Sequence, residues 1–183
     1  MSEEKASPIV VDANSLIDLI KLDALISVTK IADYRFLVVD EVVGEIRWPG
    51  QVRILGSVLK SGSAFRVSLC TTEELALFTR LQAVLDLGES ASLAYASLHS
   101  CLLLSDETQR AFMREVIALI GEERLVRTPS LLAQAIESHI VSLSGLKSRL
   151  GMLKRTAATP RERDDVGHLQ RVLDRVRERI KGE

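Results

Sequence analysis

Short apolar runs alternate along the chain with longer segments whose apolar residues recur at helical spacing. The runs are apolar on both faces, which is typical of interior parallel strands, and cover residues 9–11, 35–39, 64–70, 101–105 and 124–127. Helical spacing is found over residues 14–31, 41–47, 51–60, 72–84, 89–99, 107–120 and 129–142. This alternation predicts an α/β fold, in three α/β/α layers around a parallel central sheet of four to five strands.

The pattern changes after about residue 143. An Arg-rich segment carries apolar residues every three or four positions, at Val166, Leu169, Leu173, Val176 and Ile180. A second amphipathic pattern, from Ile140 to Leu153, precedes it. We therefore expect a domain over residues 1–142 and a basic amphipathic helical extension over residues 143–183.

Composition indicates an ordinary globular chain of 183 residues, with 46% hydrophobic and 27% charged residues. No apolar run approaches the roughly 20 residues that span a bilayer, and the opening MSEEKASP lacks the apolar core of a signal peptide. We expect a cytoplasmic protein with no membrane partner. Cys70 and Cys101 belong to no CxxC or Cys/His cluster, so both are expected to be reduced core residues.

Charge is distributed unevenly along the chain. Residues 147–183 hold 11 Lys and Arg against 6 Asp and Glu, a net charge of +5. Since the whole chain has a net charge of −1, the preceding part carries −6. An acidic body is thus joined to a basic tail.

Acidic residues follow several of the predicted strands. Asp12, Asp40 and Asp106 come at or directly after strand ends, while Glu45 and Glu89 lie near the starts of the helices that follow. Each one taken alone is best explained as a helix cap or a favourable charge in a first helical turn. Together they should meet at the carboxyl edge of the sheet, where ligands of such folds bind.

Clustered carboxylates raise each other's pKa unless a cation compensates them. Mg²⁺ or Mn²⁺ prefers oxygen ligands, polarises phosphoryl oxygens and lowers the pKa of water for attack. The acids therefore predict a divalent-metal site. A residue that binds the metal can also cap a helix, so the two roles are compatible. Zinc is disfavoured because His99, His139 and His168 follow no ligand spacing.

Four segments resemble the acidic motifs of PIN domains, small metal-dependent nucleases that include VapC-like toxin ribonucleases. The segments are IVVDANSLIDL, VVDEVVGEI, LDLGESASLAYA and LLLSDETQRAFM. The resemblance runs from about Ile9 to Val116, continues loosely to about residue 137, and leaves the tail unexplained. The segment around Glu89 is the most specific of the four.

The resemblance implies a role for individual residues. Asp12, Glu45, Glu89 and Asp106 match the four metal-binding and catalytic acids, with Glu107 as a substitute for Asp106. Asn14 and Ser105 match polar residues that support the first and last acids. Asp40 is left as a cap or supporting group. A phosphotransferase with an aspartate nucleophile is disfavoured, because such enzymes need a second Asp where this chain has Asn14.

The implied function is Mg²⁺- or Mn²⁺-dependent endoribonuclease activity, with RNA as substrate and the chain as toxin of a toxin–antitoxin pair. The alternative is a PIN-fold module that binds RNA or protein without catalysis. Arg47, Arg110 and Arg114 are candidate substrate contacts, and Trp48 is expected to pack beneath the turn at Pro49 rather than stack on a base. The tail is expected to fold back on the domain, to form a homodimer or partner interface, or to contact RNA.

Overall fold

Five parallel strands form the centre of the computed structural model, which describes residues 6–182. They are ordered β3–β2–β1–β4–β5, and every neighbouring pair is parallel. Their bounds are β1 (Ser7–Val11), β2 (Tyr34–Val39), β3 (Ala64–Val67), β4 (Leu102–Leu104) and β5 (Leu125–Val126). The predicted parallel α/β sheet is confirmed. Residues 1–5 and 183 lie outside the described residues. The first of these ranges belongs to the predicted domain and to the MSEEKASP segment.

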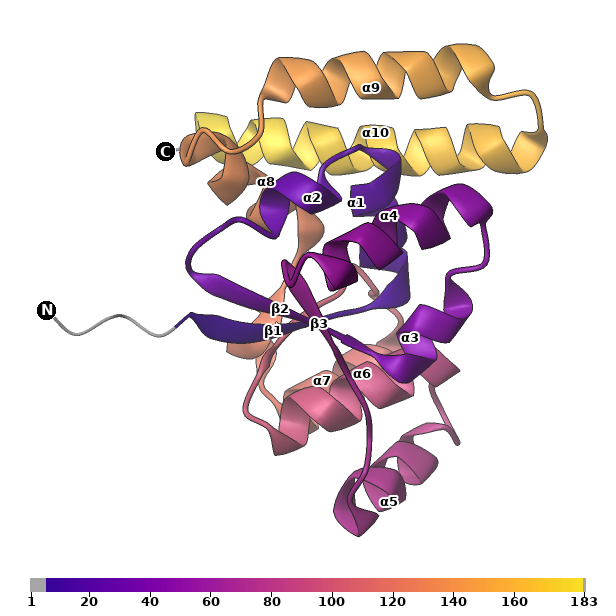
Figure 1. Cartoon of the computed structure of the whole chain (residues 1–183), viewed down its shortest axis with the longest axis vertical. Coiled ribbons are helices and arrows are strands. Elements are labelled where there is room, and N and C mark those ends of the chain that lie inside the picture. The colour runs from indigo at the N-terminus through magenta and orange to yellow at the C-terminus, as the bar shows by residue number, and fades with distance from the viewer. Residues whose placement is uncertain (1–5, 183) are drawn as a thin grey trace, which may run out of the picture.

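Helices cover both faces of this sheet (Figure 1). One face carries α1 (Ala13–Lys21), α2 (Leu25–Val28), α4 (Pro49–Lys60) and α8 (Thr128–Glu137). The opposite face carries α5 (Thr72–Leu81), α6 (Leu87–Leu98) and α7 (Arg110–Leu119). The short α3 (Asp40–Glu45) follows β2, and a 3₁₀ turn, η1 (Glu122–Arg124), precedes β5. Strand residues such as Val10 and Leu103 are fully buried between the layers, which explains their apolar character on both faces.

The chain order of the strands reverses at the centre of the sheet. From β1 the chain steps outward to β2 and β3, and then returns to place β4 on the other side of β1. In parallel α/β folds such a reversal opens a crevice at the carboxyl ends of the two central strands. The ends of β1 and β4 are therefore where a ligand site is expected.

Four details of the sequence-based prediction are wrong. The helix predicted over residues 14–31 is broken between α1 and α2, where Asp23 has a left-handed φ of 58° that a helix cannot continue. The strand predicted over residues 64–70 ends at Val67. Cys70 is exposed rather than part of the core, although both cysteines are free and Cys101 is buried. Trp48 is 66% exposed instead of packed beneath Pro49.

The predicted helical extension is present as two adjacent helices, α9 (Leu143–Thr156) and α10 (Pro160–Lys181). α10 packs against α8, and α9 packs against α10. Both helices lie beside the end of α1 (Figure 1). Their stripes are buried, notably at Leu146, Leu150, Leu169, Leu173 and Val176. The extension thus folds back on the domain through an apolar interface.

Polar contacts fasten the same hairpin to α1. Lys21 Nζ lies 2.8 Å from an Asp165 carboxylate oxygen, and Arg149 Nε donates to the Lys21 carbonyl at 2.9 Å. His168 Nε2 lies 2.6 Å from Asp18 Oδ2, and this contact raises the pKa of His168. Among the described helices, none is both long and apolar enough to cross a membrane.

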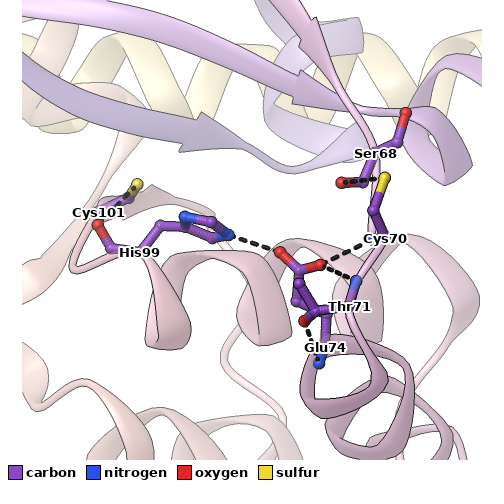
Figure 2. Close-up of polar contacts among 6 residues, drawn as sticks. All are labelled: Ser68, Cys70, Thr71, Glu74, His99 and Cys101. Atoms are coloured by element: carbon purple, nitrogen blue, oxygen red, sulfur yellow. Dashed lines mark hydrogen bonds and ion pairs between the residues drawn. The ribbon is translucent and has the colours of Figure 1, made fainter.

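A buried carboxylate, Glu74, ties the start of α5 to the end of α6. Figure 2 shows its side chain between His99 and the backbone before α5. Its Oε2 accepts from the N–H groups of Cys70 at 2.7 Å and Thr71 at 2.6 Å, and its Oε1 lies 2.5 Å from His99 Nε2. Burial raises the pKa of Glu74, but these hydrogen bonds outweigh it and lower the pKa to about 2.

We expect Glu74→Gln to lower the free energy of unfolding by about 2 kcal/mol at pH 7, because hydrogen bonds to a charged acceptor are removed. Since the folded pKa lies below the unfolded value, this contribution is complete above about pH 4.5 and is lost as pH falls toward 2. Urea unfolding at pH 7 and pH 3 measures it. Glu73→Gln, on the exposed side of α5, is the control. Equal effects of the two variants would contradict the assignment.

Candidate metal centre

The carboxyl ends of β1 and β4 bring together residues from opposite halves of the sequence. Strand register pairs Val11 with Leu104, and the Asp12 N–H donates to the Leu104 carbonyl at 3.0 Å. Asp12 follows Val11 at the end of β1, and Ser105 follows Leu104 at the end of β4, so these two residues lie side by side. Ser105 Oγ donates to Asp12 Oδ2 at 3.4 Å.

Asp12 is 2% exposed. Burial raises the pKa of its carboxyl group to about 7, and the negative charges of Glu89 and Glu45 add to the effect, against the N–H groups of Ala13 and Asn14, which lower it. Asp12 occupies the N-cap position of α1, yet its side chain makes no capping hydrogen bond. Capping alone therefore does not explain a carboxylate here.

Glu45, at the end of α3, reaches the N-terminus of α6. Its Oε1 accepts from the Gly88 N–H at 2.8 Å. A Cβ atom at position 88 would lie only 2.8 Å from that oxygen, so the glycine leaves room for the carboxylate. This contact gives a physical reason for the glycine in the LGE segment.

Glu89 lies in the first turn of α6 and is 9% exposed. Its Oε2 accepts from the Asp86 N–H at 3.3 Å. Burial raises the pKa of Glu89, and the charges of Glu107, Asp86 and Glu45 raise it further. The charges of Glu107 and Glu45 thus act on Glu89, and the charge of Glu89 acts on Asp12.

Asp106 is directed away from this group. Its Oδ1 accepts from the Thr128 N–H at 2.9 Å, at the start of α8, while its Oδ2 is buried without a partner among the described residues. Its charge raises the pKa of His168 on α10 rather than that of Asp12 or Glu89. Of the two adjacent acids, Glu107 is the one whose charge acts on Glu89, and its Oε1 accepts from the N–H groups of Thr108 and Gln109 at 2.6 Å.

Supporting contacts hold the loop after β4. Ser105 Oγ accepts from the Glu107 N–H at 3.2 Å. Arg127, which follows β5, donates to the carbonyls of Ser105 at 2.9 Å and Glu107 at 2.6 Å. Sequence reasoning missed Arg127, although a basic residue directly after the fifth strand falls on the same edge. Asn14 is exposed, and only its backbone N–H acts on the Asp12 carboxylate.

In the described part of the chain, the remaining predicted residues make no hydrogen bond or ion pair with Asp12, Glu45 or Glu89. Arg47, Arg110 and Arg114 are exposed, and Arg114 is paired with Glu115. Asp40 accepts hydrogen bonds from Ser68 and Arg66, which lower its pKa. Asp40 therefore joins α3 to β3 instead of facing Asp12.

The carboxylates fit a hard divalent cation by their chemistry. Within residues 6–182, no Lys, Arg or His forms an ion pair with Asp12, Glu45, Glu89 or Glu107, so their mutual repulsion has no side-chain compensation. No three such groups in this part of the chain are arranged to hold an ion directly. Their oxygen donors suit Mg²⁺ or Mn²⁺, ions that commonly keep several waters between metal and protein.

Comparison with known families identifies the family of this chain. A family model described as a PIN domain matches residues 8–139. This range contains the whole sheet except Ser7, and it contains Asp12, Glu45, Glu89, Asp106 and Glu107. Searches among curated proteins and among solved structures give no match. The match spans well over half of the chain and ends before α9 and α10. The chain belongs to the PIN-domain family.

Proposed function

We propose that this chain is a divalent-metal-dependent ribonuclease that hydrolyses phosphodiester bonds in RNA. The observation that carries the proposal is Asp12, buried at the carboxyl ends of the central strands with its pKa raised to about 7 by burial and by the charges of Glu89 and Glu45. Membership of a family whose members are generally nucleases supports the same reaction class.

Asp12, Glu45 and Glu89 would hold the metal, with the fourth acid supplied after β4. Glu107 and Asp106 are both candidates for that place. The charge of Glu107 acts on Glu89 while its carboxylate accepts from the N–H groups of Thr108 and Gln109, and the Asp106 carboxylate accepts from the Thr128 N–H. Mg²⁺ or Mn²⁺, when bound, supplies a positive charge that polarises the phosphoryl group and lowers the pKa of the attacking water.

The chain's own residues arrange this chemistry. Ser105 donates to Asp12 and so holds the orientation of its carboxylate. The Gly88 N–H donates to Glu45 and so fixes the position of its carboxylate. Arg127 donates to the backbone carbonyl of Glu107 and so holds the loop that carries this residue. Burial of Asp12 excludes water from one side of the site and strengthens its electrostatic interactions.

The proposal is tested by incubating a random-sequence RNA pool with wild type in Mn²⁺, in Mg²⁺ and in EDTA. We expect cleavage with either metal and none in EDTA. Glu89→Gln should reduce cleavage at least about 100-fold, while Glu73→Gln should leave it unchanged. If wild type binds RNA but leaves it intact with every metal, the chain is the non-catalytic binding module instead.

Replacing the glycine beside Glu45 separates site geometry from stability. We expect Gly88→Ala to displace the Glu45 carboxylate and to weaken Mn²⁺ binding about tenfold, because the added Cβ occupies its place. Stability should change by less than about 1 kcal/mol, since alanine favours helices. Calorimetric titration with Mn²⁺ and thermal unfolding measure both effects. Gly56→Ala, on α4 with nothing within 4 Å, is the matched control and should bind Mn²⁺ as wild type does.

A toxin role of the VapC type is the finer form of the proposal, with an antitoxin protein as partner and a homodimer as the assembly. Expression in bacteria should then arrest growth, and Asp12→Asn should relieve the arrest at equal protein level, because the arrest depends on RNA cleavage. Colony counts and immunoblotting measure this. Growth arrest by both forms would contradict a nuclease toxin.

A further inference from the structure

A cavity of about 470 Å³ lies between the start of α8 and the last turns of α10. Its walls include Asp106 and Arg127 from the strand ends and Arg175 and Arg179 from α10. Asp106 directly follows Ser105, whose hydroxyl contacts Asp12. The cavity therefore adjoins the loop after β4, whose Ser105 and Glu107 carbonyls accept from Arg127, and the C-terminal hairpin forms one side of it.

The cationic side chains of this cavity are not neutralised by ion pairs. Among the described residues, Arg127, Arg175 and Arg179 form no salt bridge with a carboxylate. Arg175 and Arg179 are exposed and four residues apart on α10, so both extend from the same side of the helix. Two guanidinium groups placed in this way match the oxygen atoms of a phosphate.

Two acids share the cavity, Asp106 and Glu178. The Asp106 carboxylate accepts from the Thr128 N–H, and Glu178 is exposed on α10. Three arginines against two acids leave a positive balance. This balance contrasts with the neighbouring cluster of Asp12, Glu45 and Glu89, which repels phosphates until a cation binds.

We propose that this cavity holds a phosphate of the RNA strand next to the one cleaved, so that Arg175 and Arg179 make the C-terminal hairpin part of the substrate site. The proposal rests on the proposed ribonuclease function. It gives a role to Arg175 and Arg179, two of the 11 Lys and Arg residues of the basic tail. It also explains the use of arginine, since bidentate contacts to phosphate favour it over lysine.

The test measures equilibrium binding of a fluorescent single-stranded RNA by anisotropy over a range of salt concentrations. All proteins carry Glu89→Gln, so that metal-dependent turnover does not consume the RNA. Adding R175Q and R179Q together should weaken binding about 10- to 100-fold at low salt. The slope of log K against log salt should fall by about 0.7 for each RNA phosphate that the variant no longer binds. Glutamine is shorter than arginine but is polar, uncharged and similar in helix propensity, so thermal unfolding should be unchanged at these exposed positions.

The matched control carries R161Q and R163Q in the same background. Both residues are exposed on the first turns of α10 and lie outside the cavity walls, and the change in net charge is identical. RNA affinity and salt slope close to those of the parent support the proposal. Equal losses of affinity in both double variants would overturn it in favour of a diffuse attraction between tail and RNA.

Failure of this inference is distinguishable from failure of the proposed function. If wild type cleaves RNA with metal while R175Q/R179Q leaves affinity and salt slope unaltered, the cavity holds no RNA phosphate and the nuclease assignment stands. If wild type neither binds nor cleaves RNA, both are overturned.

Discussion

Asp12→Asn is expected to raise the stability of the metal-free protein at pH 8 by up to about 4 kcal/mol. The folded pKa of Asp12 is about 7, against 3.8 for the ordinary side chain, and each pKa unit corresponds to about 1.4 kcal/mol. The folded state therefore binds this proton more tightly than the unfolded state, and wild-type stability falls as pH rises from about 4 to about 7. Asparagine has the same shape and no charge, so Asp12→Asn removes the destabilisation that the buried negative charge of Asp12 causes at high pH.

Thermal unfolding in EDTA at pH 4 and pH 8 measures the effect. The variant should match wild type at pH 4 and exceed its Tm by about 8–16 °C at pH 8. Asp40→Asn is the control, because contacts with Ser68 and Arg66 lower the pKa of Asp40 and its neutralisation should not stabilise the fold. Saturating Mn²⁺ should then stabilise wild type and leave Asp12→Asn nearly unchanged. A variant that is less stable than wild type at pH 8 without metal would contradict the account of Asp12.

Leu173→Ala should destabilise the whole molecule by about 2–5 kcal/mol, the usual cost of a cavity left by a buried leucine. Leu173 is 1% exposed on α10 and belongs to the single apolar core that the hairpin shares with the domain. We propose that residues 143–182 fold as one cooperative unit with the domain. The decrease in stability should therefore be seen in a single unfolding transition.

Urea unfolding followed by tryptophan fluorescence and by circular dichroism measures this effect. Trp48 reports on the domain, since it lies at the start of α4, while circular dichroism also follows α9 and α10. Met152→Ala, at a position 47% exposed on α9, should change stability by less than about 1 kcal/mol. Separate midpoints for the two signals would show that the hairpin unfolds independently.

The sequence was sufficient to predict the sheet, its helical layers and the helical extension, because buried parallel strands and amphipathic helices leave clear periodic patterns. The break at Asp23 and the exposure of Trp48 were not predictable in this way. A single left-handed residue interrupts a helix without changing its apolar spacing. Exposure of one aromatic residue depends on whether a neighbouring element covers it, which local sequence does not specify.

For the candidate site, too, some features were predictable from the sequence and others were not. Strand register places Asp12 beside Ser105 at the carboxyl edge, where the predicted strand ends had put them, whereas Asp40 and Asp106 follow strand ends but contact other elements. The choice between Asp106 and Glu107 depends on the direction of adjacent side chains in a loop, and is influenced by contacts with Thr128 and Arg127 from a later part of the chain. The cavity of Arg175 and Arg179 depends on how α10 packs against α8, which periodicity alone does not determine.

The most direct test of the central claim is RNA cleavage by wild type in ¹⁸O-labelled water with Mn²⁺, with products analysed by mass spectrometry. Hydrolysis by an attacking water predicts one ¹⁸O atom in each newly formed terminal phosphate, together with loss of cleavage in EDTA and in Asp12→Asn. Cleavage that persists in EDTA, or that yields cyclic phosphates without label, would contradict a metal-dependent hydrolytic site built around Asp12.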